Sequence, residues 1–267
     1  MKQRIKKLCL FLFAIIAAIH LIHAATLDRR IQYVEISFAS SNIPAEMDGY
    51  VIAFIADTHG LSCDVLHGIV EELNSKNIDL LLLGGDLDSR RNDPQRTLEI
   101  LAQTRTRDGI FGVEGNHDIR ADLFDAKREN GIVPLQNEGL HIRDGFFLAG
   151  VEDAWRRPCV VSAVEGAYES DFVLLLSHNP DISMKQDMAR VCLVLSGHTH
   201  GGQITFFGVW APYFTFRSSI TDYGQRFRSG WAAGHDGTPV FVSNGTGQYL
   251  PRVFARPQVI LLELAAS

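Results

Sequence analysis

The stretch Val51-Ile52-Ala53-Phe54-Ile55-Ala56-Asp57-Thr58-His59 decides the fold of this chain. Its first six residues are all apolar, and such a run without alternation is typical of a strand buried on both faces of a parallel sheet. Asp57 and His59 follow this run directly. Because ligands of α/β proteins bind beyond the carboxyl ends of parallel strands, we expect both side chains to face a functional site.

The same arrangement, an apolar run followed by acidic, amide or imidazole residues, occurs four more times in the chain. The four motifs are Gly85-Asp86, Gly115-Asn116-His117-Asp118, Ser177-His178-Asn179 and Gly197-His198-Thr199-His200. A single Asp-x-His is common by chance, a single Gly-Asn-His-Asp is only suggestive, and an isolated histidine is usually structural. Five such motifs, each after an apolar run, predict instead that the polar side chains converge at one edge of a sheet.

Strand and helix patterns alternate through the first half of the chain, which indicates βαβ units. Apolar residues at helical spacing predict a helix over residues 62–74, Asp93-Pro94 is a typical helix start, and a third helix is expected over residues 120–130. The second half has strand-like runs with few helices between them. These runs cover residues 140–151, 172–176, 191–195, 239–243 and 258–264. We therefore predict an α/β fold in which two sheets pack face to face with helices on their outer surfaces.

The charge balance argues against a nucleic-acid partner. The chain has 267 residues and a net charge of −6, and four of its basic residues lie within the first seven positions. The remainder carries 21 basic and 31 acidic residues, a balance of −10. Nonspecific nucleic-acid binding requires basic surface, so no nucleic-acid partner is expected. The four cysteines match neither a zinc motif nor a disulfide framework.

Residues 8–27 contain no Lys, Arg, Asp or Glu. Twenty helical residues span about 30 Å, which matches the hydrocarbon core of a bilayer. The basic residues precede this run, so the positive-inside rule predicts a cytoplasmic N-terminus and places the remainder of the chain on the outer side of the membrane. We favour residues 1–27 as a signal anchor followed by one domain over residues 28–267. A cleaved signal peptide ending near Ala24-Ala25 is the alternative.

The motif residues suit a pair of divalent cations. Oxygen and imidazole ligands without thiolates favour manganese, iron or zinc, with manganese as our first choice. Two ions about 3.5 to 4 Å apart need a bridging anion, for which Asp86 is the natural candidate. Asp57 and His59 share one loop, His198 and His200 have the same spacing on another, and Asn116 and His178 complete the set.

Together these motifs resemble the calcineurin-like metallophosphoesterase superfamily over roughly residues 50–265. The strings around His178 and His198, and the ending Arg256-Pro257-Gln258-Val259-Ile260, are similar to a subgroup of membrane-associated or exported bacterial phosphodiesterases. That subgroup is related to the UDP-2,3-diacylglucosamine pyrophosphatases. The resemblance implies a four-layer αββα sandwich with a dinuclear metal site that hydrolyses phosphodiester or pyrophosphate bonds. A lipid-linked substrate such as UDP-2,3-diacylglucosamine is also an expectation.

The resemblance also implies a role for each motif residue. Asp57, His59 and His200 would hold one ion, Asn116, His178 and His198 the second, and Asp86 would bridge them. His117 resembles the family's catalytic histidine, with Asp118 beside it to orient and charge it. The chain departs from the family's Gly-Asp-x-x-Asp-Arg pattern, so neither Asp88 nor Arg90 is given a role. A scaffold that keeps the fold without catalysis is the alternative function.

An aromatic segment over residues 203–217 follows the last ligand motif. Its rings are Phe206, Phe207, Trp210, Tyr213, Phe214 and Phe216. Two interpretations stay open. The rings either bind acyl chains or the bilayer interface, or they cover one end of the core.

Overall fold

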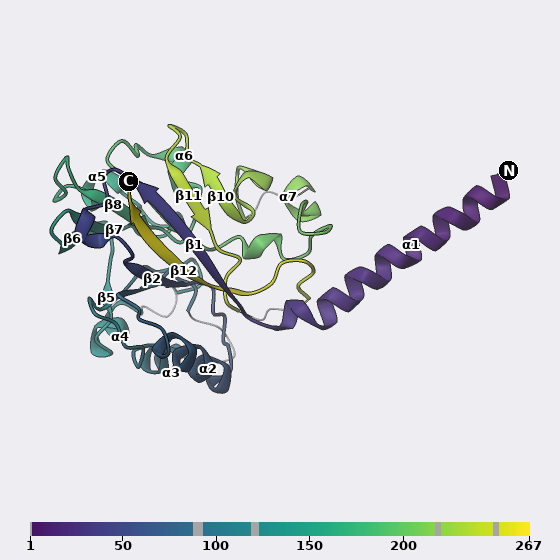
Figure 1. Cartoon of the computed structure of the whole chain (residues 1–267), viewed down its shortest axis with the longest axis horizontal. Coiled ribbons are helices and arrows are strands. Elements are labelled where there is room, and N and C mark those ends of the chain that lie inside the picture. The colour runs from purple at the N-terminus through teal and green to yellow at the C-terminus, as the bar shows by residue number, and fades with distance from the viewer. Residues whose placement is uncertain (1, 88–92, 119–122, 217–219, 248–250) are drawn as a thin grey trace.

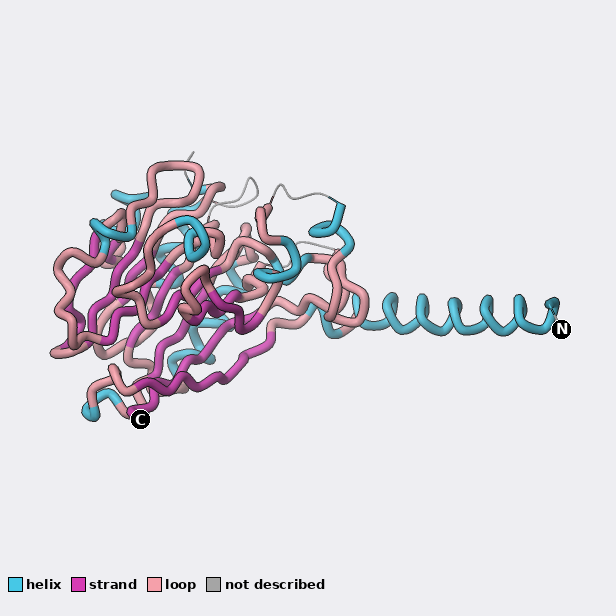
Figure 2. Tube along the Cα trace, turned by 90° about the horizontal axis from the view of Figure 1, so that it is seen from above, coloured by secondary structure: helices cyan, strands magenta, loops and turns pink. Residues whose placement is uncertain are grey.

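A computed structural model describes residues 2–87, 93–118, 123–216, 220–247 and 251–267 of the chain. They form an α/β body from which the N-terminal helix α1 (Lys2–Ala25) projects, as Figure 1 and the second view in Figure 2 show. None of the residues of α1 is buried. The helix is long and apolar enough to cross a membrane, which agrees with the charge-free run in its sequence.

The first sheet has six strands in the order β1-β12-β2-β3-β4-β5. The strands are β1 (Gln32–Ser40), β2 (Val51–Ile55), β3 (Leu80–Leu83), β4 (Ile110–Gly112), β5 (Val133–Pro134) and β12 (Gln258–Ala266). Strands β2 to β5 are parallel, as the βαβ pattern predicted. The last strand of the chain, β12, returns to this sheet, where it is parallel to β1 and antiparallel to β2.

The second sheet also has six strands, in the order β10-β11-β9-β8-β7-β6. They are β6 (Glu138–Arg143), β7 (Phe146–Gly150), β8 (Phe172–Leu176), β9 (Leu193–Ser196), β10 (Gly230–Ala233) and β11 (Pro239–Val242). The four central strands are parallel, and the edge strands β6 and β10 are antiparallel to their neighbours. The continuous apolar runs of β7, β8 and β9 are buried throughout, as expected for strands covered on both faces.

Three apolar cores hold the layers together, and their order gives the predicted αββα sandwich. Phe54 and Leu82 contribute to the core between the two sheets, which also receives Leu174 from the second sheet. Their neighbours Ala53 and Ile55 point to the opposite face, because successive side chains of a strand alternate between faces. On that face the helices pack against the first sheet, and a third core lies on the outer face of the second.

The helices occupy the outer layers and the connections. They are α2 (Cys63–Asn74), α3 (Pro94–Leu101), α4 (Leu123–Glu129), α5 (Val160–Ala163), α6 (Ile182–Lys185) and α7 (Pro212–Phe216), with 3₁₀ turns at Leu27–Arg29, Ala45–Met47, His200–Gly202 and Gly224–Phe227. Asp93 caps α3 by accepting a hydrogen bond from the Gln95 N–H, and proline follows at the first helical position. Ser62 lies at the N-cap position of α2, but its side chain makes no capping hydrogen bond. The start of the helix expected over residues 120–130 lies outside the described residues.

Candidate metal centre

Every sequence motif lies just beyond the carboxyl end of a strand. Strands β2, β3 and β4 deliver the motifs of the first sheet, and β8 and β9 deliver those of the second. The two sheets thus present five loops at one edge of the sandwich. The predicted ligand side chains of these loops meet there in two adjacent groups.

Asp57, His59 and His200 form the first group. Their potential ligand atoms all lie within 4.8 Å of one another. The His59 Nε2 and His200 Nε2 atoms are 3.0 Å apart, and His200 Nε2 is 3.4 Å from Asp57 Oδ1. Two imidazoles and a carboxylate aimed at one point are a donor set for a divalent cation of borderline hardness.

Asp86, His178 and His198 form the second group, and all three are buried. The His178 Nε2 atom is 3.1 Å from His198 Nδ1 and 3.3 Å from Asp86 Oδ2. Asn116 joins them, with its Oδ1 atom 3.2 Å from His178 Nε2. This group offers one carboxylate, one amide oxygen and two imidazoles.

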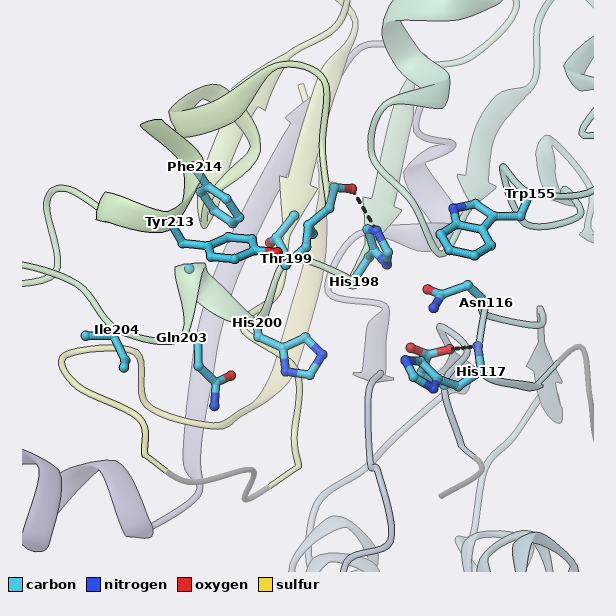
Figure 3. A pocket seen from close by; sticks show the side chains of 13 residues that line it. Asn116, His117, Trp155, His198, Thr199, His200, Gln203, Ile204, Tyr213 and Phe214 are labelled. Atoms are coloured by element: carbon cyan, nitrogen blue, oxygen red, sulfur yellow. Dashed lines mark hydrogen bonds between the residues drawn. The ribbon is translucent and has the colours of Figure 1, made fainter. Parts of the chain in front are cut away.

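The carboxylate of Asp86 lies between the two groups. Its Oδ2 atom is 3.5 Å from His59 Nε2 in the first group and 3.3 Å from His178 Nε2 in the second. The other oxygen, Oδ1, accepts a hydrogen bond of 2.8 Å from the His117 N–H, drawn as a dashed line in Figure 3. One carboxylate oxygen is therefore within reach of both groups, as a bridging ligand must be.

The ring nitrogens that face away from the site fix the orientation of two imidazoles. His178 Nδ1 donates to the Gly84 carbonyl and His198 Nε2 donates to the Ile220 carbonyl, both at 2.8 Å. Because a carbonyl can only accept, these nitrogens carry the protons. His178 Nε2 and His198 Nδ1 keep their lone pairs toward the site. Metal-binding histidines are oriented in this way by carbonyl groups behind them.

The backbone at the site adopts an uncommon conformation. Asp57, His59, Asp86, His198 and His200 all have positive φ angles, between 38° and 71°. Non-glycine residues rarely occupy this region, and such strain persists only where surrounding contacts impose it. The Asp57 N–H donates to the Gly85 carbonyl at 2.9 Å, and the Gly247 N–H donates to the Asp57 carbonyl at 2.7 Å. Strain concentrated on the converging side chains indicates that their position serves a function.

Gly115 and Gly197 lack side chains at positions where the carboxylates of the site fill the space. A Cβ atom at Gly115 would collide with the Asp86 carboxylate, and one at Gly197 would collide with the carboxylate of Asp57. The motif loops therefore approach one another more closely than side chains at these positions would allow.

The charges of the site suit a cation. Burial raises the pKa of Asp57, but the neighbouring His200 and His178 outweigh this effect and hold the pKa near 2. Burial lowers the pKa of His59 and of His198 to about 4, so both rings are neutral and able to coordinate at pH 7. Burial also acts to lower the pKa of His178, but the Asp86 and Asp57 carboxylates raise it well above its usual value. The ionised carboxylates and the neutral imidazoles of His59 and His198, without a thiolate, fit manganese, iron or zinc, and a bound cation would displace the proton of His178.

His117 differs from the groups described above because its side chain is exposed. Its ring lies edge-on to that of His59, with the ring centroids 5.1 Å apart. The adjacent Asp118 is fully buried, where its Oδ1 accepts from the Leu87 N–H at 2.8 Å and its Oδ2 from the Gly115 N–H at 2.9 Å. Asp118 therefore ties the Asp86 loop to the Asn116 loop. Asp88 and Arg90 lie outside the described residues.

A pocket of about 570 Å³ opens over the two groups (Figure 3). Asp86, Asn116, His117, His198 and His200 lie at its polar centre. Apolar side chains line it on both sides of this centre. Trp155 lies on one side, and Ile204, Tyr213 and Phe214 lie on the other.

The sequence motifs missed Trp155 and the buried Asp153. Trp155 is 71% exposed at the edge of the pocket, and its backbone N–H donates to Asp153 Oδ1 at 3.0 Å. Burial raises the pKa of Asp153, which lies close enough to His178 and Asp86 to feel their charges. The available signal was the acidic pair Glu152-Asp153 directly after the apolar run of residues 146–151, which repeats the pattern of the five motifs.

Comparison with known proteins agrees with this geometry. The model of the calcineurin-like phosphoesterase family matches residues 50–202, which includes every motif from Asp57 to His200. An uncharacterized metallophosphoesterase of Helicobacter pylori is 32% identical over 224 residues, covering 78% of this chain and 58% of the relative. The uncharacterized metallophosphoesterase YkoQ of Bacillus subtilis is 30% identical over 200 residues, covering 68% of this chain and 71% of the relative.

A third relative carries a membrane-spanning part. The zebrafish transmembrane protein with metallophosphoesterase domain is 27% identical over 282 residues, covering 94% of this chain and 61% of the relative. The chain thus spans about 60% of the length of the H. pylori and zebrafish relatives. The family match, the H. pylori similarity and the convergent ligand groups lead to one conclusion: the chain belongs to the calcineurin-like phosphoesterase family.

Proposed function

We propose that the chain hydrolyses phosphodiester or pyrophosphate bonds at a site that holds two divalent metal ions. One observation carries this proposal. Asp57, His59 and His200 converge beside Asp86, His178 and His198, with an oxygen of Asp86 within 3.5 Å of an imidazole nitrogen in each group.

In this proposal each motif side chain has a defined task. The first group would hold one ion, the second group together with Asn116 would hold the other, and Asp86 would contact both. When bound, the ions supply a water of lowered pKa as the nucleophile and neutralise charge on the phosphoryl oxygens. The carbonyls of Gly84 and Ile220 keep the imidazoles aimed inward throughout turnover.

His117 is placed to act on the substrate. Its ring is exposed and lines the pocket beside His59, while its backbone N–H fixes the carboxylate of Asp86. From this position a protonated imidazole would donate a proton to the oxygen of the leaving group. Asp118 would act through the loops, because its carboxylate joins the backbone at Gly115, just before His117, to that at Leu87, just after Asp86.

The walls of the pocket support a substrate with groups on both sides of the phosphate. Trp155 offers one apolar surface, and Ile204 and Tyr213 offer another across the polar centre. A monoester would leave one of these surfaces without a partner. A diester or pyrophosphate with an acyl-bearing part fits both, so we propose a lipid-linked substrate such as UDP-2,3-diacylglucosamine.

The proposed location follows from helix α1. Its charge-free run would anchor the chain in a bacterial cytoplasmic membrane, and the basic residues that precede the run would keep the N-terminus in the cytoplasm. In this proposal residues 1–27 form the anchor, and residues 28–267 form the catalytic domain on the outer side.

Metal-dependent turnover tests the proposed activity. We expect chelator-treated protein to be inactive and to regain hydrolysis of bis(p-nitrophenyl) phosphate when about two equivalents of manganese are bound. Metal content is measured by elemental analysis and turnover by nitrophenolate release, with iron and zinc compared in the same assay. Protein that binds metal but hydrolyses neither this diester nor a panel of pyrophosphates would instead be a non-catalytic scaffold.

A second prediction concerns the lipid-linked substrate. We expect Ile204→Ser combined with Tyr213→Ser to raise the KM for an acylated pyrophosphate about tenfold, because two apolar surfaces of the pocket are lost. The KM for bis(p-nitrophenyl) phosphate should change less than threefold. Val161→Ser, at an exposed apolar residue of α5 that does not line the pocket, is the control. Equal losses on both substrates would contradict an acyl-binding wall.

A further inference from the structure

One face of helix α1 contacts the body near the C-terminal end of the helix. The half-buried residues of the helix are Ile16, Ala17, His20, His23 and Ala24. Their spacing of three or four residues places them on a single face. The rest of the helix is exposed, so α1 contacts the body only through its last turns and projects beyond them (Figure 1).

Aromatic rings of two loops form the other side of this contact. The His20 ring lies 5.3 Å from Phe206, 4.6 Å from Phe207 and 5.0 Å from Phe254, measured between ring centroids. The His23 ring stacks on Phe254 at 3.8 Å. The loop that follows the last ligand motif is therefore packed along the end of the helix.

A buried carboxylate fixes this junction. Asp28 is completely buried, and its Oδ2 atom lies 2.7 Å from His23 Nδ1 and accepts a hydrogen bond of 2.9 Å from the Phe254 N–H. One side chain thus joins the helix to the loop that carries Phe254. The position of α1 relative to the aromatic rings is held by polar contacts as well as by packing.

The aromatic loop ends in a tight turn with an apolar tip. The Phe206 N–H donates to the Trp210 carbonyl at 2.7 Å, and Phe207 and Gly208 have positive φ angles. Val209 at the tip is 77% exposed, Phe206 48% and Trp210 40%. Tight turns in water are dominated by Gly, Pro, Asn, Asp and Ser, and contiguous exposed apolar groups mark an interaction site.

The position of this turn along the axis of α1 indicates which environment the turn contacts. His20 lies seven residues before the end of the charge-free run of residues 8–27 and five residues before the end of α1, which corresponds to about 7 Å of helix. Phe206 and Phe207 pack beside His20 and therefore lie at the level of the apolar helix, not beyond its end. A helix segment at that depth would be surrounded by the boundary region of a bilayer.

We infer that residues 204–210 together with Phe254 form a bilayer-contact surface that enters the outer leaflet beside α1. This inference rests on the membrane anchor proposed above and deepens the proposed function. Ile204 belongs both to this surface and to the wall of the pocket. The surface would thus hold the mouth of the pocket at the lipid head groups, where an acylated phosphate ester enters without leaving the leaflet.

Tryptophan fluorescence in lipid vesicles tests the inference on the full-length chain. The protein has three tryptophans, of which Trp210 lies in the proposed surface. One variant, Trp155→Phe with Trp231→Phe, keeps only Trp210, and a second, Trp155→Phe with Trp210→Phe, keeps only Trp231. Each is reconstituted into phosphatidylcholine vesicles that contain lipids brominated near the head-group end of the acyl chain.

Trp231 is a suitable control because it lies far from α1. Its ring packs on Phe38 and Phe241, at centroid distances of 5.8 Å and 5.1 Å. Phe38 is six residues along β1 from Gln32, or about 20 Å from the start of the strand next to α1. Brominated lipids should therefore quench Trp231 weakly.

We expect brominated lipids to quench Trp210 at least threefold more strongly than Trp231. A second probe, Val209→Trp in a chain with the three natural tryptophans replaced by phenylalanine, should be quenched at least as strongly, because Val209 is the more exposed position. Equal quenching of Trp210 and Trp231 overturns the inference. Acrylamide then identifies the alternative, since a ring in water is quenched by it and a ring covered by a second copy of the chain is not.

Activity of the unsubstituted chain, reconstituted in vesicles of the same composition, separates this inference from the proposed function. Metal-dependent hydrolysis of soluble bis(p-nitrophenyl) phosphate does not require contact with the bilayer. Turnover without quenching of Trp210 would keep the hydrolase and reject the bilayer-contact surface. Quenching without turnover on any phosphate ester would keep the surface and reject the hydrolase.

Discussion

Asp86→Asn should reduce metal-dependent turnover by on the order of 10³-fold or more. Asparagine has the shape of aspartate but lacks its charge, and the Oδ2 atom of Asp86 lies within 3.5 Å of imidazole nitrogens from both ligand groups. Removal of this carboxylate should weaken both proposed ion sites at once. We therefore expect elemental analysis to show the bound metal falling from about two equivalents to one or fewer.

Asp79 provides a matched control for this substitution. It precedes the same strand, β3, at the end opposite to Asp86, and it is also a buried carboxylate. Its Oδ2 atom accepts a hydrogen bond of 2.8 Å from the Val51 N–H, remote from the ligand groups. Asp79→Asn should lower the melting temperature without changing the metal content. If Asp86→Asn retained two equivalents of metal and full activity, Asp86 would not bridge the ions.

The fold was predictable from sequence where local pattern determines local structure. The apolar run of residues 51–56 predicted a buried strand, which β2 (Val51–Ile55) confirms. The αββα arrangement followed from alternating strands and helices in the first half and successive strands in the second. The convergence of the motifs was predictable for the same reason, because parallel strands bring their carboxyl ends to one edge.

The sequence did not predict which strands pair with each other in the sheets. The run of residues 258–264 predicted a strand in the second half of the chain, yet β12 lies between β1 and β2 in the first sheet. An apolar run records that a strand is buried and not which neighbours it pairs with. The strained backbone of the site could not be predicted from sequence either. The positive φ angles of Asp57 and Asp86 depend on hydrogen bonds to other loops.

The aromatic segment shows a third limit. Its composition left two interpretations open, and the structure contains elements of both. Phe214 is buried, whereas Phe206, Phe207, Trp210 and Tyr213 are exposed to 39% or more. The end of the segment at Arg217 lies outside the described residues. Composition alone cannot separate the buried ring from the exposed ones, because the turn at residues 206–210 and the packing of α7 together decide which rings face outward.

His117→Ala should retain both metal ions and lose turnover by about 10²- to 10⁴-fold, the range expected for removal of a general acid. The His117 side chain is exposed in the pocket, and the loop is held by its backbone N–H on Asp86 Oδ1 and by Asp118 on Gly115. Alanine keeps these backbone contacts. The ligand groups should therefore stay in place, and elemental analysis should show unchanged metal content.

The leaving group provides the sharper measurement. p-Nitrophenolate departs readily without a proton, whereas an alkoxide needs one. If His117 donates that proton, the rate loss of His117→Ala should be at least tenfold larger for a dialkyl diester, whose leaving group is an alkoxide, than for bis(p-nitrophenyl) phosphate. His67→Ala is the control, because the ring of His67 donates to the Cys63 carbonyl on α2 and does not line the pocket. Equal losses for good and poor leaving groups would show that His117 stabilises phosphoryl charge instead, and loss of metal would place it among the ligands.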